Sequence, residues 1–417
     1  MLLRNCHRTG VLALSFLIAL LRQVSHGVAA ESGLVAPSGL EKSVEFWQQV
    51  FGKYDSKTVL FFDPFDQATI YSTLKISDSP AGRAALEKER RRVLADHDLD
   101  EEMGRLRTQR GAKDQFLAGL RAGGRYLPEM KKIFRDQELP TDLAYLPLVE
   151  SFFNLRARSP VGAAGIWQFM PETGRKFLRI DNTVDERLDP IASTRAAAKL
   201  LKENYQILGS WPLAITAYNH GTEGLFRAIQ VTGSRNLVDI IRRYKSDRFG
   251  FASQNFYAEF LAVVYLAKNS ERYFPFLRMQ PPLVLREWTV SHTTSVEAML
   301  KPAAITAKDF YGWNPALAPG LKQLAAGQRI NLPADKYDSF IIAQRRAADS
   351  RKEKKPTVVV AAPATAASKP ASAKAPAKVR LAAAKPSKVS KASVERAGAA
   401  APRLKIARRR DTVVPAG

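Results

Sequence analysis

Cysteine is nearly absent from this chain: Cys6 is the only one in 417 residues. A single cysteine can form neither an internal disulfide nor a thiolate cluster for a metal ion. Histidine is also scarce, and His97, His220 and His292 stand far apart without a His-Glu-x-x-His pattern. No glycine-rich nucleotide loop is present either. We therefore expect no metal site and no cofactor.

Long hydrophobic runs are missing too. The apolar run at residues 11–21 follows basic residues, precedes the small residues 28–30, and is too short for a comfortable membrane span. This pattern is typical of a secretory signal peptide, which we assign to residues 1–30. An uncleaved anchor is the alternative. Cys6 precedes the apolar run, so it is wrongly placed for lipid attachment at a cleavage site.

Acidic residues are under-represented, with 40 against 64 basic residues and a net charge of +24. Residues 351–417 hold 17 of the Lys and Arg side chains and three acidic ones. The Ala/Lys/Pro/Ser-rich composition of residues 350–417 predicts a disordered basic tail. Such a tail suits an anionic wall or membrane surface. Nucleic acid is the rival partner, but the export signal and the lack of aromatic residues among the charges argue against it.

The first part of the mature chain, residues 31–110, has a mixed α/β pattern. It predicts helices near residues 40–54 and 84–98, and strands near residues 57–62 and 68–74. We find no chemistry-bearing motif here.

Residues 111–280 have helical patterns throughout. Asp189-Pro190 is a strong helix start, and that helix is expected to end at Gly209. Trp211-Pro212 starts another, and residues 256–268 form an apolar one. The pattern predicts an all-α domain, which makes the fold class mainly α.

Residues 285–335 change character. Strands are expected near residues 287–290 and 329–333, with helices near residues 295–300 and 307–311 between them. This order predicts a compact βααβ unit.

Glu150 ends an apolar stretch, residues 143–151. If the stretch is helical, Leu139, Leu143 and Leu146 share one side. Glu150 lies on that same side. A carboxyl held against apolar surface has a raised pKa, as a proton donor to a leaving glycosidic oxygen requires. The alternative is an ordinary helix-end glutamate paired with an arginine.

Two short motifs follow this glutamate: Gly165-Ile166-Trp167-Gln168 and Ala217-Tyr218-Asn219-His220-Gly221. Small residues before and at the first motif predict a tight turn that lets a ligand approach the backbone. Its amide and aromatic side chains suit the hydroxyls and apolar face of a sugar. Taken singly, the first motif could be a packed corner and the second a buried tyrosine.

In this order and spacing, the three motifs resemble those of the lytic transglycosylases of the goose-lysozyme-like superfamily. The resemblance is nearest to the membrane-bound lytic murein transglycosylase D type, and it covers about residues 125–270. It implies a lysozyme-like all-α domain at residues 111–280. It also implies cleavage of the β-1,4 bond between N-acetylmuramic acid and N-acetylglucosamine, with formation of 1,6-anhydro ends.

The resemblance assigns a role to each motif residue. Glu150 is the catalytic acid and then the base. Ser151 and Asn219 orient the substrate, Gln168 contacts the sugar near the cleaved bond, and Tyr218 positions Glu150 or the acetamido group. The expected partner is the glycan strand of peptidoglycan, and the expected location is the periplasm or cell envelope.

A fourth motif departs from the family pattern. Where the family often has Glu-Thr-x-x-Tyr, Phe256 stands at the tyrosine position and Tyr257 one residue later. We expect Tyr257 to take the substrate-binding role through a shift; loss of the role is the alternative.

The βααβ unit resembles a LysM module, a small domain that binds glycans containing N-acetylglucosamine. Residues 314–317 and 324–333 carry the resemblance. The usual Gly-Asp-Thr after the first strand is replaced by His292-Thr293-Thr294. The unit is therefore degenerate, and both glycan binding and a purely structural role stay open.

Two other functions remain possible. A hydrolytic lysozyme or chitinase-like glycosidase would use a second carboxylate, but the motif set offers only Glu150. Nearby acidic residues have the pattern of loop and helix-cap positions: Asp181, Asp185, Glu186 and Asp189. A non-catalytic cell-wall-binding protein with an inactive groove is the other possibility.

Overall fold

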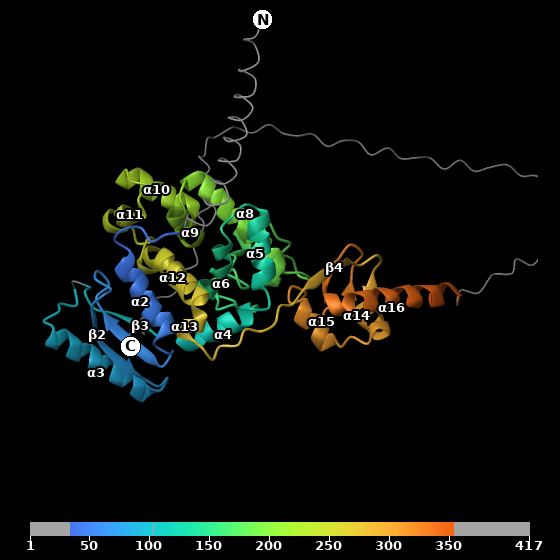
Figure 1. The fold of residues 1–417 in the computed structure, drawn as a ribbon, viewed down its shortest axis with the longest axis horizontal. Helices are drawn as coiled ribbons and strands as arrows, with labels where there is room; N and C mark the ends of the chain where they lie inside the picture. The colour runs from blue at the N-terminus through green and yellow to red at the C-terminus, as the bar shows by residue number, and fades with distance from the viewer. Residues whose placement is uncertain (1–33, 103, 354–417) are drawn as a thin grey trace, which may run out of the picture. The chain divides into compact units, whose positions relative to one another are not determined.

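The computed structural model describes residues 34–102 and 104–353. The predicted signal peptide and residues 354–417 of the predicted tail lie outside them. The mainly helical fold class is confirmed (Figure 1). Among the described residues, no helix combines the length and apolarity needed to cross a bilayer.

The N-terminal region (residues 34–110) contains two helices and a three-stranded antiparallel sheet of order β2-β1-β3. Its elements are α2 Glu41–Gly52, β1 Thr58–Phe62, β2 Ile70–Lys75, α3 Pro80–Asp96 and β3 Arg107–Arg110. The sequence did not predict β3, because its four residues, Arg-Thr-Gln-Arg, have no apolar alternation. Pairing with the buried strand β1 stabilises β3 in spite of its polar sequence.

The central strand β1 is buried along its whole length. Successive side chains of a strand point to opposite faces. Leu60 and Phe62 accordingly join the main hydrophobic core, whereas Val59 and Phe61 join a smaller cluster with Val93 of α3. The sheet therefore has packed side chains on both faces.

Helices form the body of the protein between residues 113 and 273. They are α4 Lys113–Gly123, α5 Leu127–Asp136, η1 Thr141–Tyr145, α6 Pro147–Glu150, α7 Pro171–Gly174, η2 Glu186–Leu188, α8 Pro190–Leu208, α9 Trp211–His220, α10 Thr222–Thr232, α11 Leu237–Arg243, α12 Phe251–Lys268 and α13 Ser270–Tyr273. The predicted limits of α8 are confirmed: Asp189 caps its first turn, and Gly209 ends it at φ 76°. The apolar helix α12 lies alongside α2, where Gly52 lies against Leu266 (Figure 1).

The C-terminal module (residues 285–344) has strands paired as β4 with β7 and β5 with β6, both antiparallel. The elements are β4 Leu285–Thr289, β5 Thr294–Ser295, α14 Val296–Leu300, η3 Lys301–Ala303, α15 Ala307–Trp313, β6 Gln323–Leu324 and β7 Arg329–Pro333, followed by α16 Ala334–Glu353. Phe310, Leu332 and Phe340 are fully buried in a separate core. The prediction of disorder from residue 350 is wrong for residues 350–353, which belong to α16. That helix is anchored through Phe340.

Candidate functional site

Glu150 is the last residue of a one-turn helix. The continuous helix expected over residues 143–151 is instead divided into η1 and α6. Pro147 explains the break, because proline has no N–H to continue the hydrogen-bond ladder of η1 but suits the first position of a new helix. Leu143 and Leu146 are fully buried as predicted, while Glu150 is only half-buried. The carboxyl group therefore emerges at the edge of the core.

The backbone turns sharply just after this glutamate. Phe152 and Phe153 have φ angles of 50° and 55°, in the left-handed region that side chains other than glycine rarely adopt. Two glycines of α4 make room for them. A Cβ at Gly119 would lie 2.7 Å from the Phe152 carbonyl oxygen, and one at Gly123 would lie 2.9 Å from the Phe153 ring. Such strain persists only where the surroundings fix it, as at many functional sites.

The motif at residues 165–168 forms a short turn. Side chains from the other two motifs, at residues 150–151 and 217–221, donate hydrogen bonds to its backbone. The Ser151 hydroxyl donates to the Ile166 carbonyl at 2.9 Å, and the Tyr218 hydroxyl donates to the Trp167 carbonyl at 2.8 Å. The Trp167 indole is buried and donates to the Thr194 hydroxyl at 2.9 Å. The three motifs, separate in sequence, therefore meet in space.

The charge of Glu150 affects the ionisation of Tyr218. Burial raises the pKa of the Tyr218 hydroxyl well above its usual value, and the negative charge of Glu150 raises it further. At neutral pH the phenol is therefore protonated. It donates its hydrogen bond to the Trp167 carbonyl and cannot serve as a base.

Gln168 and Asn219 are half-buried and engaged within the protein. Gln168 has φ 48°, and its amide nitrogen lies 2.8 Å from the Gly165 carbonyl and 3.4 Å from the Ala157 carbonyl. The Asn219 side-chain oxygen accepts a hydrogen bond from the Ser253 hydroxyl at 2.9 Å. The structure thus places both residues by specific contacts.

Tyr257 is buried away from a position in which it could bind a substrate. Its side chain is 0% exposed, and its hydroxyl donates to the Val35 carbonyl at 3.0 Å. A tyrosine buried in this way presents no surface to a sugar, so the substrate-binding role expected of Tyr257 is withdrawn. The neighbouring Phe256 is buried as well.

His220, in the same motif as Tyr218 and Asn219, is also internal. It is 2% exposed and packs edge-on against Phe249. Burial lowers its pKa to about 4. It is therefore neutral near pH 7.

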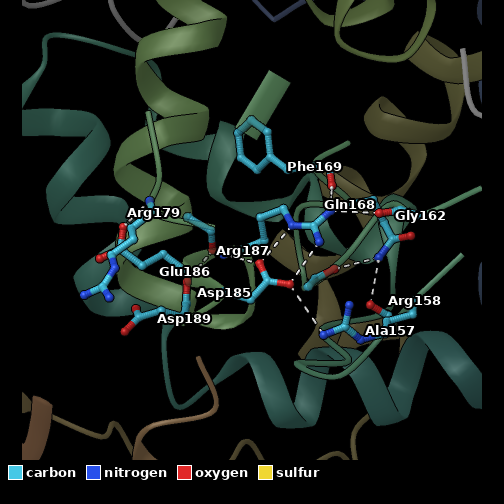
Figure 2. Close-up of polar contacts among 12 residues, drawn as sticks. Ala157, Arg158, Gly162, Gln168, Phe169, Arg179, Asp185, Glu186, Arg187 and Asp189 are labelled. Carbon is cyan, nitrogen blue, oxygen red and sulfur yellow. Dashed lines mark hydrogen bonds and ion pairs between the residues drawn. The ribbon is translucent and has the colours of Figure 1, made fainter. Parts of the chain in front are cut away.

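Arg187 is the residue of this region that the sequence did not single out. Its guanidinium forms two hydrogen bonds with Asp185, both 2.9 Å, and donates to the carbonyls of Gly162 at 2.8 Å and Phe169 at 3.0 Å (Figure 2). The turn also packs on its backbone, since a Cβ at Gly165 would lie 1.8 Å from the Arg187 carbonyl oxygen. The only signal was an arginine two residues after an aspartate, a pattern equally typical of a surface pair.

The neighbouring acidic residues have the structural roles expected of them. Asp189 accepts hydrogen bonds from the first backbone N–H groups of α8, at Ile191 and Ala192, both 2.8 Å. Asp181 accepts hydrogen bonds from the Thr183 hydroxyl and backbone, which lower its pKa. Both carboxylates are thus committed to local structure.

In the described part of the chain, the motifs coincide neither with a group of metal-binding side chains nor with the cavity beside the C-terminal module. Across residues 34–102 and 104–353, no three His, Cys, Asp or Glu side chains gather closely enough to hold a metal ion. A cavity of about 540 Å³ lies between α5, residues 184–195 and the C-terminal module. Asp189, Arg329 and Asn331 line it, whereas Glu150 does not.

The segment that carries the three motifs is similar to known proteins. Residues 129–240 match the family described as Transglycosylase SLT domain. Over 146 residues the chain is 34% identical to the membrane-bound lytic murein transglycosylase D of Escherichia coli K12, covering 33% of this chain and 30% of that protein. The chain therefore spans less than a third of this relative's length.

Two solved structures are similar at lower identity. The 70 kDa soluble lytic transglycosylase of Escherichia coli is 21% identical, covers 35% of this chain and 24% of its own, and has a TM-score of 0.28. The lytic transglycosylase Slt of Pseudomonas aeruginosa is 23% identical, covers 36% of this chain and 24% of its own, and has a TM-score of 0.29.

Proposed function

We propose that the protein is a peptidoglycan lytic transglycosylase, because residues 129–240 match the Transglycosylase SLT domain family. One observation supports this most strongly. The half-buried Glu150 stands where Ser151 and Tyr218, from separate motifs, hold the same turn through the Ile166 and Trp167 carbonyls. A single well-placed acid beside a fixed turn is the arrangement that this reaction needs.

The proposed reaction uses Glu150 twice. Its carboxyl first protonates the oxygen between N-acetylmuramic acid and N-acetylglucosamine, and the C1–O bond breaks. The resulting carboxylate then accepts the proton of the muramic C6 hydroxyl, whose oxygen bonds to C1. The product carries a 1,6-anhydro end and no water is consumed. A general acid–base residue of this kind contributes about 10²–10⁴-fold to the rate.

The remaining motif residues serve positioning and binding in this proposal. Tyr218 stays protonated beside Glu150 and, with Ser151, fixes the turn that carries Gln168. Gln168 and Asn219 are the proposed sugar contacts, each held by a defined partner.

The test is digestion of purified peptidoglycan sacculi with the wild-type protein and with Glu150→Gln. Mass spectrometry of the soluble products distinguishes anhydro ends from reducing ends, which are heavier by one water. We expect anhydro products from the wild type and a rate lower by about 10²–10⁴-fold in the variant. Glu172→Gln, an exposed glutamate in α7, is the matched control and should cleave normally.

Other results would change the assignment. Reducing ends would indicate a hydrolase with a second carboxylate. Binding to sacculi without any products would indicate a non-catalytic wall-binding protein. Substantial cleavage by Glu150→Gln would remove Glu150 from the catalytic role.

We further propose that the protein is exported to the periplasm or cell envelope. In this organisation, residues 1–30 are the signal peptide, residues 31–110 an extension, residues 111–280 the transglycosylase domain and residues 285–335 a degenerate LysM-like module. The basic residues 350–417 provide a tether to an anionic surface. The tether predicts that retention on anionic vesicles falls as ionic strength rises. Retention unaffected by salt would contradict it.

A further inference from the structure

The loop formed by residues 179–189 of the helical body enters the core of the C-terminal module. Val184 is 3% exposed and belongs to the module's hydrophobic cluster. It pairs with Leu317 in an antiparallel bridge. Main-chain hydrogen bonds flank it, from Asp185 to the Ala316 carbonyl at 2.8 Å and from Ala318 to the Thr183 carbonyl at 2.9 Å. The loop is thus attached to the module by one antiparallel bridge and by the buried side chain of Val184.

The same loop also contacts the residues on either side of the turn at residues 165–168. Asp185, next to Val184, orients Arg187 through two hydrogen bonds. The buried Arg187 guanidinium then holds the carbonyls of Gly162 and Phe169, which bracket the turn (Figure 2). A continuous chain of contacts therefore runs from the module core to the turn that Ser151 and Tyr218 also contact.

Two polar side chains of strand β7 form further contacts with the loop. Arg329 donates to the Glu186 carboxylate at 2.9 Å, and the Asn331 amide donates to the Asp189 carboxylate at 2.7 Å. Both backbone groups of Asn331 are already paired with the Asn314 side chain. The Asn331 side chain is therefore available for the loop alone, and replacing it leaves the strand's own contacts intact.

From these contacts, and resting on the proposed function, we propose that the C-terminal module is a positioning element for the site. It fixes residues 179–189, and Arg187 is the positioning residue through which the loop sets the turn. This role differs from glycan binding by the module, because it affects the cleavage step on any substrate. Small displacements of positioning groups can cost orders of magnitude in rate.

The test exchanges the side chains of Asn331 in β7 and Asp189 in the loop, which are joined by a hydrogen bond. In the full chain, Asn331→Asp places a second carboxylate against Asp189. The double variant Asp189→Asn/Asn331→Asp restores one donor and one acceptor, and asparagine is as good a helix cap as aspartate. Asn331→Ala serves as a milder break if Asn331→Asp fails to fold. Lys322→Ala, in the module's own hollow away from the loop, is the matched control.

Two readouts are needed. Hydrogen exchange is followed at the Ala164 and Gly165 amides, which are bonded to the Phe169 and Ala157 carbonyls. Cleavage is measured with a short soluble peptidoglycan fragment. For Asn331→Asp we expect faster exchange at both amides and a kcat lower by on the order of tenfold, with KM little changed. The double variant should recover both, and Lys322→Ala should alter neither.

The outcomes separate the two proposals. Unchanged exchange and unchanged kcat in Asn331→Asp or Asn331→Ala would overturn the positioning role. A higher KM at constant kcat would also overturn it, in favour of simple glycan binding by the module. If the wild type cleaves nothing but exchange responds and recovers as expected, the enzymatic function fails while the structural coupling stands.

Discussion

The two regions that flank the helical body are attached to it in different ways. The N-terminal region shares the hydrophobic core of the body. The same buried cluster contains residues of α12 and Phe46, Trp47, Leu60 and Phe62. The C-terminal module has its own core around Phe310 and Phe340, to which the helical body contributes only Val184 among the buried residues. One region is part of the main core, and the other is joined to it by a loop and by polar contacts.

This difference bears on how each region can influence the site. A shared core transmits any loss of packing to the whole body, since apolar burial is the main stabilising term. A module with a separate core can loosen while the body stays folded. The N-terminal region is therefore expected to control global stability, and the module to control local geometry at residues 162–169.

The largest expected effect comes from Trp47→Ala in α2. Trp47 is 4% exposed, stacks on Phe51 and donates to the Asn255 side chain at 3.0 Å. Removing a buried tryptophan costs about 3–5 kcal/mol. Denaturant unfolding should show this loss in the transition that contains the body.

Phe65→Ala is the control for that change. Phe65 lies in the same N-terminal region but is 75% exposed, so its removal should shift stability by no more than about 0.5 kcal/mol. If the Trp47 variant kept full stability, the N-terminal region would have to be an independent unit.

Lowering the pH should destabilise the helical body through protonation of His220. Burial, reinforced by the charges of Arg248 and Arg227, lowers its pKa from 6.5 to about 4. Between these values the unfolded chain binds a proton that the folded chain does not. Stability is therefore lost as pH falls through this window, by about 3 kcal/mol in all.

Equilibrium unfolding between pH 7 and pH 4 measures this term. His220→Asn should give a flatter pH dependence in the transition of the body. His292→Asn, an exposed histidine of the module, should behave as the wild type. Parallel curves for His220→Asn and the wild type would show that the buried histidine is not the source.

A smaller effect is expected from Val184→Ala at the junction. Losing two buried methyl groups from the module's cluster should cost about 1–3 kcal/mol. Because the module has its own core, calorimetry should show the loss in the module's transition, with the main transition unmoved. A shift of both transitions together would mean that body and module unfold as one unit.

The sequence predicted local elements better than their junctions. The limits of α8 could be predicted from Asp189 and Gly209 because capping chemistry is local. Tyr257 was misplaced because its hydroxyl is held by a hydrogen bond to the Val35 carbonyl, 222 residues away in the sequence. Arg187 was missed for the same reason. Its guanidinium donates to two backbone carbonyls that are distant in the sequence, and no pattern of neighbouring side chains predicts such contacts.

The smallest expected effect concerns surface charge in the N-terminal region. Lys42 and Asp66 form an ion pair at 3.1 Å, with side chains 66% and 41% exposed. Exposed pairs of this kind contribute little to stability, because water screens them and both side chains lose freedom. Lys42→Ala should therefore shift the denaturation midpoint far less than Trp47→Ala, although both residues lie on α2. A comparable loss in the two variants would mean that charge, and not the shared apolar core, holds the N-terminal region to the body.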